Sequence, residues 1–71
     1  MNNKIYVSFR DILVNNHRVQ IMETIAFGFK ISINTELKPQ QDQYGWYLSY
    51  NPSKAFLKAN SQGYITLIIN G

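Results

Sequence analysis

Apolar side chains occupy every second position in the middle of the chain. Successive side chains of a β-strand point to opposite faces, so this spacing gives one apolar face and one small or polar face. A helix would distribute the same side chains around its circumference. The pattern predicts one strand over residues 24–34, with its apolar face against the core. That face consists of Ile25, Phe27, Phe29, Ile31 and Ile33.

The N-terminal part of the chain predicts a β-hairpin. Apolar and polar residues alternate over residues 4–10, which indicates a strand with one buried face, and residues 11–14 continue it. Asn15 and Asn16 suit a two-residue turn, because Asn tolerates the left-handed conformation that tight hairpins need. Residues 17–21 are then the returning strand.

The register of this hairpin places the charged Arg10 opposite the apolar Ile21. A β-bulge near residues 9–11 would restore the facing of the apolar side chains. An acidic residue interrupts the apolar series and predicts a bend over residues 22–24. A short helix is the competing interpretation of residues 17–26, but the period-2 spacing favours a strand.

The middle of the chain predicts a loop followed by an aromatic strand. Residues 35–43 contain a proline, three glutamines and three charged residues, as expected for a loop. Residues 44–50 alternate again, and Pro52 ends this strand because proline cannot donate to a ladder. One face of the strand carries Tyr44, Trp46, Leu48 and Tyr50. Tyr47 points to the other face, which makes it the tyrosine expected to be most exposed.

The C-terminal part contains one ambiguous segment and one clear strand. Residues 53–60 suit either a short helix capped by Ser53 or a strand that enters a turn over residues 60–63. The Asn-to-Gly turn favours the strand. Residues 64–69 are a final strand without charged side chains, so we expect it to be central in the sheet, or to be an edge covered by a second copy.

Five to six short strands predict a mostly β fold. A small antiparallel barrel or rolled sheet, OB-like or SH3-like, buries such strands without bare edges, with room for one short helix. Seventy-one residues predict one domain over residues 1–71. Hydrophobic residues make up 45% and charged residues 15% of the chain, which argues against disorder.

The composition excludes disulfides and thiolate metal sites, because the chain has no cysteine. No apolar run approaches the roughly 18 residues needed to cross a bilayer, so we expect no membrane partner and a cytoplasmic location. His17 is the only histidine, and the four acidic residues are far apart in sequence. We therefore expect neither an enzyme nor a cofactor or metal site.

Aromatic and basic residues are the candidate binding groups. Tyrosine rings stack on the bases of single strands while Lys and Arg contact phosphates, and the net charge of +3 permits such a partner. Tyr and Arg also anchor protein interfaces.

The sequence thus predicts a single-stranded nucleic-acid binder of low sequence specificity. The alternative is a protein-interaction or inhibitor module, possibly viral, that acts on a host protein through a strand edge or an aromatic patch. A homodimer through the last strand is a separate expectation. The candidate residues are Arg10, Arg18, Lys30, Tyr44, Tyr47, Tyr50, Lys54 and Lys58.

Overall fold

The computed structural model describes residues 3–26 and 28–71 and is mostly β, as predicted. The described residues contain no α-helix, and therefore none long and apolar enough to cross a membrane. The described residues form eight strands in place of the predicted five to six. They are β1 (Asn3–Tyr6), β2 (Ser8–Val14), β3 (His17–Ala26), β4 (Phe29–Thr35), β5 (Gln40–Asp42), β6 (Gly45–Tyr50), β7 (Ala55–Ala59) and β8 (Ile65–Ile69), with the 3₁₀ turn η1 (Pro52–Lys54) between β6 and β7.

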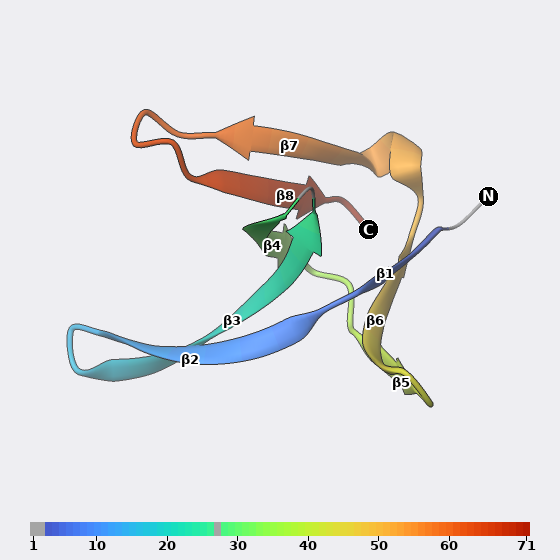
Figure 1. The fold of residues 1–71 in the computed structure, drawn as a ribbon, viewed down its shortest axis with the longest axis horizontal. Helices are drawn as coiled ribbons and strands as arrows, with labels where there is room; N and C mark the ends of the chain where they lie inside the picture. The colour runs from blue at the N-terminus through green and yellow to red at the C-terminus, as the bar shows by residue number, and fades with distance from the viewer. Residues whose placement is uncertain (1–2, 27) are drawn as a thin grey trace.

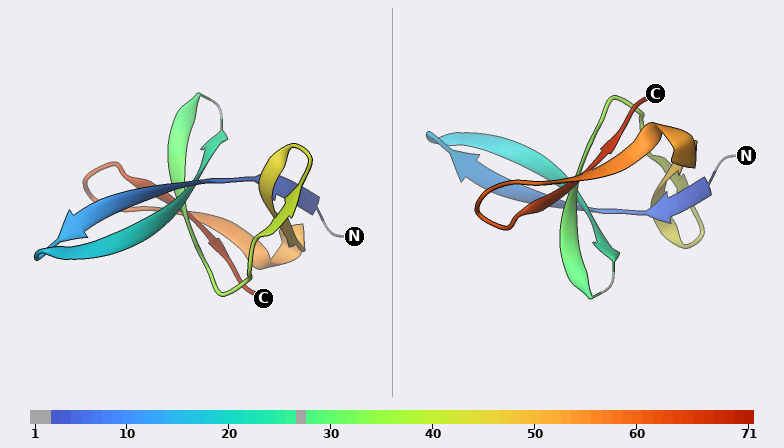
Figure 2. Two further views of the ribbon diagram at one scale, coloured as in Figure 1. Left: turned by 90° about the horizontal axis from the view of Figure 1, so that it is seen from below. Right: turned by 90° about the horizontal axis from the view of Figure 1, so that it is seen from above.

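The strands form two sheets, neither of which closes on itself within the described residues (Figure 1). A three-stranded sheet has the order β1-β6-β5, and a five-stranded sheet has the order β2-β3-β4-β8-β7. All pairs are antiparallel except β4 and β8, which are parallel. The β2–β3 and β7–β8 hairpins project to the same side, and the end of the β3–β4 hairpin projects crosswise to them (Figure 2).

The chain passes between the two sheets at two short junctions. Val7 alone separates β1 from β2, and its N–H donates to the carbonyl of Trp46 at 2.9 Å. The second junction is η1, where Asn51 Oδ1 accepts from the backbone N–H of Ser53 at 3.1 Å. This single turn takes the place of the helix considered for residues 53–60, and Asn51 rather than Ser53 caps it.

Residues 24–34 form a hairpin and not the single strand predicted from their alternation. β3 ends at Ala26 and β4 begins at Phe29, with Gly28 between them at a φ of +81°. Glycine adopts this left-handed conformation without steric cost, so the chain can reverse here. Ile25 pairs with Lys30 and is exposed, whereas Ile31 on the opposite face is buried. Phe27, also predicted to face the core, lies outside the described residues.

The first hairpin confirms the predicted turn and its register. Asn15 and Asn16 both have positive φ, and the pairing continues without a skipped residue to Ser8 opposite Glu23. The predicted bulge near residues 9–11 is therefore wrong, because Arg10 does face Ile21. β3 runs unbroken through the predicted bend at residues 22–24, and the helical alternative for residues 17–26 is also wrong.

The last hairpin confirms the strand interpretation of residues 53–60. β7 leads into a turn in which Gly63, at a φ of +86°, donates its N–H to the carbonyl of Asn60 at 3.1 Å. β8 lies between β4 and β7 and is central, as predicted. Because both edges of β8 are paired within the chain, a homodimer would need another surface, and homodimerisation stays a prediction.

The core lies where the two sheets meet. Leu48 from the three-stranded sheet contacts Ile33 and Ile69 from the five-stranded sheet, and all three are buried. Leu48 and Tyr50 thus lie on one face of β6 and contact the core, whereas Trp46, predicted on the same face, is 41% exposed. The partly buried residues around them are Ile5, Val7, Met22, Leu37, Tyr50, Ala55 and Leu67.

Candidate nucleic-acid interface

The five-stranded sheet has a polar face directed away from the core. Residues paired directly across a ladder point to the same side of a sheet. One such row crosses all five strands and contains only polar side chains. We call the face that carries this row the outer face. The row consists of Ser8, Glu23, Ser32, Thr66 and Lys58.

A groove lies on this sheet where β4 and β8 diverge. Their pairing begins at Ser32 and Thr66, so the residues before that point leave a wedge between the two strands. The wedge forms a groove of about 470 Å³. Its lining residues are Arg10, Ile21, Glu23, Phe29, Lys30, Ile31, Ser32, Gly63, Tyr64 and Ile65.

Three basic side chains from three strands share the outer face. Arg10 on β2 points to the same side as Ser8, and Lys30 on β4 pairs with Ile25, which points to the same side as Glu23. Lys58 ends the polar row on β7 and is exposed. The sheet thus brings together Arg10, Lys30 and Lys58, which are far apart in the sequence.

The Arg10 guanidinium is held in a fixed position by an ion pair. Its Nε and Nη2 each donate to one oxygen of Glu23, both at 3.2 Å. The Arg10 side chain remains 56% exposed, whereas that of Glu23 is only 11% exposed. Arg10 therefore keeps free N–H groups for a ligand, because a guanidinium carries five.

Two exposed aromatic rings border the groove. Phe29 is 68% exposed and Tyr64 is 69% exposed. Each directly follows a glycine with positive φ, Gly28 and Gly63 respectively, at the end of a hairpin. Phe29 was predicted to face the core, which its exposure shows to be wrong, and Tyr64 was not among the candidate residues. An aromatic residue immediately after a turn glycine was the signal, because a large apolar side chain at a hairpin end has little core to enter.

Arg18, Tyr50 and Lys54 lie away from this face. Arg18 pairs with Leu13 near the end of the first hairpin, on the side of the sheet opposite to Arg10. Tyr50 packs against the core, and Lys54 in η1 lies beside it in a separate shallow depression. The structure therefore does not bring these three residues together with Arg10, Lys30 and Lys58.

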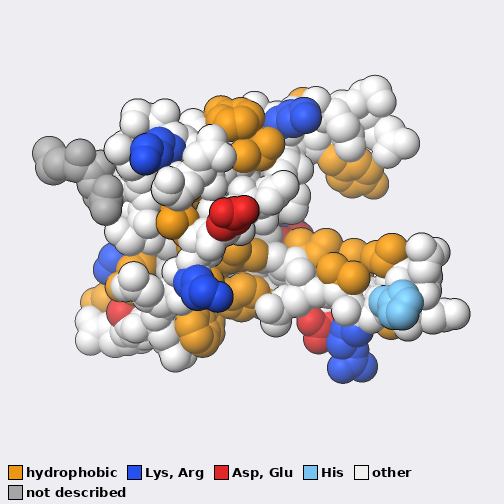
Figure 3. Space-filling view, turned by 180° about the vertical axis from the view of Figure 1, so that it is seen from behind, with side chains coloured by type: hydrophobic (Ala, Val, Ile, Leu, Met, Phe, Trp, Pro, Cys, Tyr) orange, Lys and Arg blue, Asp and Glu red, His pale blue; other side chains and the backbone are white. Residues whose placement is uncertain are grey.

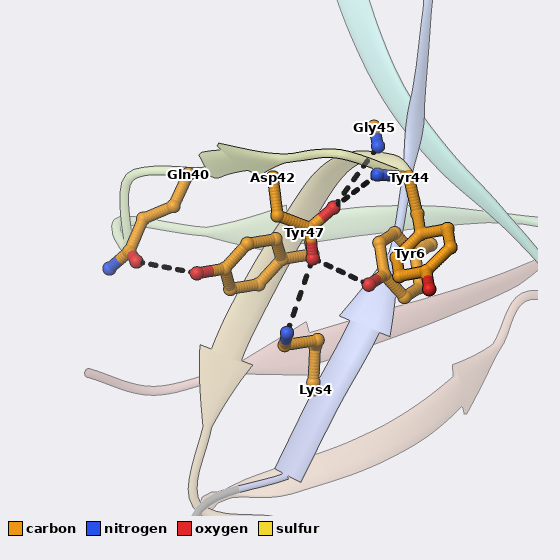
Figure 4. A network of polar contacts seen from close by, with 7 residues as sticks. All are labelled: Lys4, Tyr6, Gln40, Asp42, Tyr44, Gly45 and Tyr47. Carbon is orange, nitrogen blue, oxygen red and sulfur yellow. Dashed lines mark hydrogen bonds and ion pairs between the residues drawn. The ribbon is translucent and has the colours of Figure 1, made fainter.

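Tyr47 belongs to a polar network on the three-stranded sheet (Figure 4). The Lys4 ammonium lies 4.3 Å from the centre of the Tyr47 ring and 3.2 Å from Asp42 Oδ2. The Tyr47 hydroxyl donates to Gln40 Oε1 at 2.9 Å. One face and the hydroxyl of Tyr47 are thus already occupied, which corrects the expectation that it is the most exposed tyrosine. Tyr44, in the turn before β6, is far more exposed.

Asp42 is the centre of this network. The Tyr6 hydroxyl donates to Asp42 Oδ2 at 2.6 Å, and the backbone N–H groups of Tyr44 and Gly45 donate to Oδ1 at 2.8 and 3.2 Å. The hydrogen bond from Tyr6 lowers the pKa of Asp42. The same bond raises the pKa of Tyr6, and the hydrogen bond to Asp42 raises the pKa of Lys4.

Hydrophobic side chains gather on the facing sides of the two arms that project from the molecule (Figure 3). These arms are the β2–β3 and β7–β8 hairpins, and among their exposed residues are Leu13 and Leu57.

No group of three potential metal ligands exists within residues 3–26 and 28–71. Comparisons with protein-family models, with curated proteins and with solved structures find no match to this chain.

Proposed function

We propose that this protein binds single-stranded nucleic acid with low sequence specificity on the outer face of its five-stranded sheet. The observation that carries the proposal is the combination of Arg10, Lys30 and Lys58 on one face with the exposed ring of Tyr64 at its groove. Phe29, on the same side of β4 as Ile31, adds a second exposed ring at the rim of this groove. Cations along a groove and aromatic stacking platforms are the two features that hold single strands.

The order of the strands supports an OB-like fold as part of this proposal. If β1 with β2, and β6 with β7, each count as one bent strand, the chain has five strands. The third and fifth of these are then the parallel pair, β4 and β8, and the first and fourth pair through β1 and β6. This order supports a resemblance to the five-stranded Greek key of OB-folds, which bind oligonucleotides on strands 2 and 3 and on the loops after strands 1 and 4.

The groove lies where an OB-like fold would place its ligand. β3 and β4 are the second and third strands in this count, and the loop over residues 60–64 follows the fourth. Gly63 and Tyr64 from that loop line the groove together with β3 and β4. In the proposed complex, bases stack on Tyr64 and Phe29, while Lys30, Lys58 and the free edge of Arg10 contact phosphates.

A titration with a fluorescently labelled oligonucleotide at several salt concentrations tests the proposal. Loss of one phosphate contact in Lys30→Ala should reduce the slope of log K against log salt by about 0.7, the value for one contact on a single strand. Tyr64→Ala should weaken binding by about 1–3 kcal/mol and leave that slope unchanged.

Lys54→Ala is the matched control for this titration, because it removes the same charge outside the proposed interface. Its affinity should fall less than that of Lys30→Ala. Absence of binding to the wild-type protein at low salt, at concentrations of about tens of micromolar, would rule out the function.

A protein partner is the second candidate, because Leu13 and Leu57 on the two arms are exposed. Hydrophobic side chains also gather on the facing sides of these arms (Figure 3). Contiguous apolar patches on small proteins mark interaction sites. An inhibitor or a viral accessory protein would act in this way. Capture from a cell lysate with and without nuclease separates the candidates. A protein that the wild type still captures after nuclease treatment, and that the Leu13→Asp variant does not capture, favours this function over nucleic-acid binding.

A further inference from the structure

Glu23 is an unexpected residue in a groove for a polyanion. It is the one acidic residue among the described residues that line the groove, and as a whole residue, backbone included, it is 8% exposed. A carboxylate repels phosphate oxygens, and the repulsion is stronger where the site excludes water. The part of the ligand that approaches Glu23 should therefore be a base edge, with the phosphates directed toward Lys30 and Lys58.

The Glu23 carboxylate has hydrogen-bonding capacity to spare. Arg10 uses one lone pair on each oxygen, through its contacts of 3.2 Å. An ionised carboxylate offers about four lone-pair sites, so about two remain for another donor. Ser32 lies directly opposite Glu23, and its hydroxyl is within hydrogen-bonding distance of the Thr66 hydroxyl at 3.2 Å. Glu23 thus has acceptor capacity in the same groove that the rings of Phe29 and Tyr64 line.

We propose that Glu23 is a specificity-determining residue that accepts a hydrogen bond from the exocyclic amino group of a base stacked in the groove. Cytosine, adenine and guanine carry such an amino group, whereas thymine and uracil do not. The single N–H donor of thymine is flanked by two carbonyl oxygens that a carboxylate repels. The protein should therefore prefer amino-bearing bases, with cytosine against thymine as the cleanest comparison. This inference rests on the proposed function.

Two oligonucleotides of equal length, oligo(dC) and oligo(dT), provide the test in the intact wild-type protein. A charge-assisted hydrogen bond predicts that oligo(dC) binds about tenfold more tightly. Glu23→Gln should have two opposed effects. Removal of the negative charge should strengthen the binding of oligo(dT) about two- to fivefold, while the preference for oligo(dC) should fall to within about twofold. A purely structural role for Glu23 would change both affinities by the same factor.

Glu36→Gln is the matched control, because it removes the same charge from an exposed position outside the groove. It should leave the ratio of the two affinities unchanged. If Glu23→Gln fails to fold, Arg10→Gln decides the matter. It removes the partner of Glu23 and should weaken the binding of both oligonucleotides while the preference for oligo(dC) persists.

The outcomes separate this inference from the proposed function. Equal, saturable binding of oligo(dC) and oligo(dT) by the wild-type protein would overturn the role of Glu23 and leave the function standing. An unchanged ratio in Glu23→Gln would do the same, because Glu23 would then only hold Arg10. Loss of the preference in Arg10→Gln would assign the selectivity to Arg10. Failure of both oligonucleotides to bind would remove the function itself.

Discussion

Asp42 joins the N-terminal strand to the turn between β5 and β6. It accepts from the side chains of Lys4 and Tyr6 in β1 and from the backbone N–H groups of Tyr44 and Gly45 in the turn. The carboxylate thereby satisfies donors from two segments that are far apart in the sequence. All of these contacts converge on the carboxylate of one residue at the surface.

The lowered pKa of Asp42 predicts that the protein is destabilised by acid. A group whose pKa is lower in the folded state stabilises the fold above its unfolded pKa, and this contribution is lost as the pH falls through the folded pKa. The melting temperature should therefore decrease as the pH falls below the ordinary Asp value of 3.8. Thermal unfolding followed by circular dichroism over a pH series measures this dependence.

Asp42→Asn is the comparison for the acid series. It should melt at a lower temperature at neutral pH and lose part of the dependence on pH below 3.8, since the titrating group is gone. The raised pKa values of Tyr6 and Lys4 act in the opposite range. Their contribution to the stability of the fold is present below pH 10.0 for Tyr6 and below pH 10.5 for Lys4. It is lost as the pH rises through the raised pKa values of the folded state. An Asp42→Asn curve parallel to the wild-type curve in acid would contradict this role.

The hairpins owe their form to a few residues with positive φ. Asn15 and Asn16 have φ values of 51° and 64°, and Gly28 and Gly63 occupy the left-handed region in the other two hairpins. The Asn-Asn turn and the Gly63 turn could be predicted, because their residue types identify the turn. The Gly28 turn was missed because the apolar alternation runs straight across it, and period alone does not show that the chain reverses.

Asn16→Val should destabilise the first hairpin by about 1–2 kcal/mol, because a β-branched residue is strained at positive φ. Asn16→Gly should be neutral or slightly stabilising, since glycine adopts this conformation freely. Urea unfolding of both variants provides the free energies of unfolding. Equal stability of the Val and Gly variants would show that the turn does not depend on the backbone conformation at Asn16.

Strand facing explains why part of the interface was predicted and part was not. Arg10, Lys30 and Lys58 were identified by their charge, and the ladder places them on one face. The tyrosines of β6 were identified by their abundance, but they lie on the other sheet. The predicted bulge would have moved Arg10 off the face of Ile21, but the two residues pair directly. That face is the outer one, where a charged side chain needs no correction.

At the scale of the whole molecule, the two sheets are held together by a small core. Leu48 is fully buried and contacts Ile33 and Ile69 across the boundary between the sheets. A mostly β fold could be predicted from the alternation of apolar residues. The division into two sheets and the parallel pairing of β4 with β8 could not, because they depend on contacts between residues distant in sequence.

Leu48→Ala should unfold the protein or come close to it. Truncation of a buried leucine costs about 2–5 kcal/mol, and a chain of 71 residues has a total stability of about 4–10 kcal/mol. Leu13→Ala is the matched control, because Leu13 is 74% exposed and its truncation should change the stability by less than about 0.5 kcal/mol. Similar urea midpoints for the two variants would show that Leu48 does not join the sheets.

The pairing of β1 with β6 has a consequence for biosynthesis. Asn3 pairs with Tyr50, and Tyr6 pairs with Tyr47, so β1 finds its partner only after the chain has been made as far as β6. Until then, β1 is an open edge that can associate with other nascent chains. The hairpin of β2 with β3 closes locally and can form early, whereas closure of the N-terminal segment must wait and should set the pace of folding.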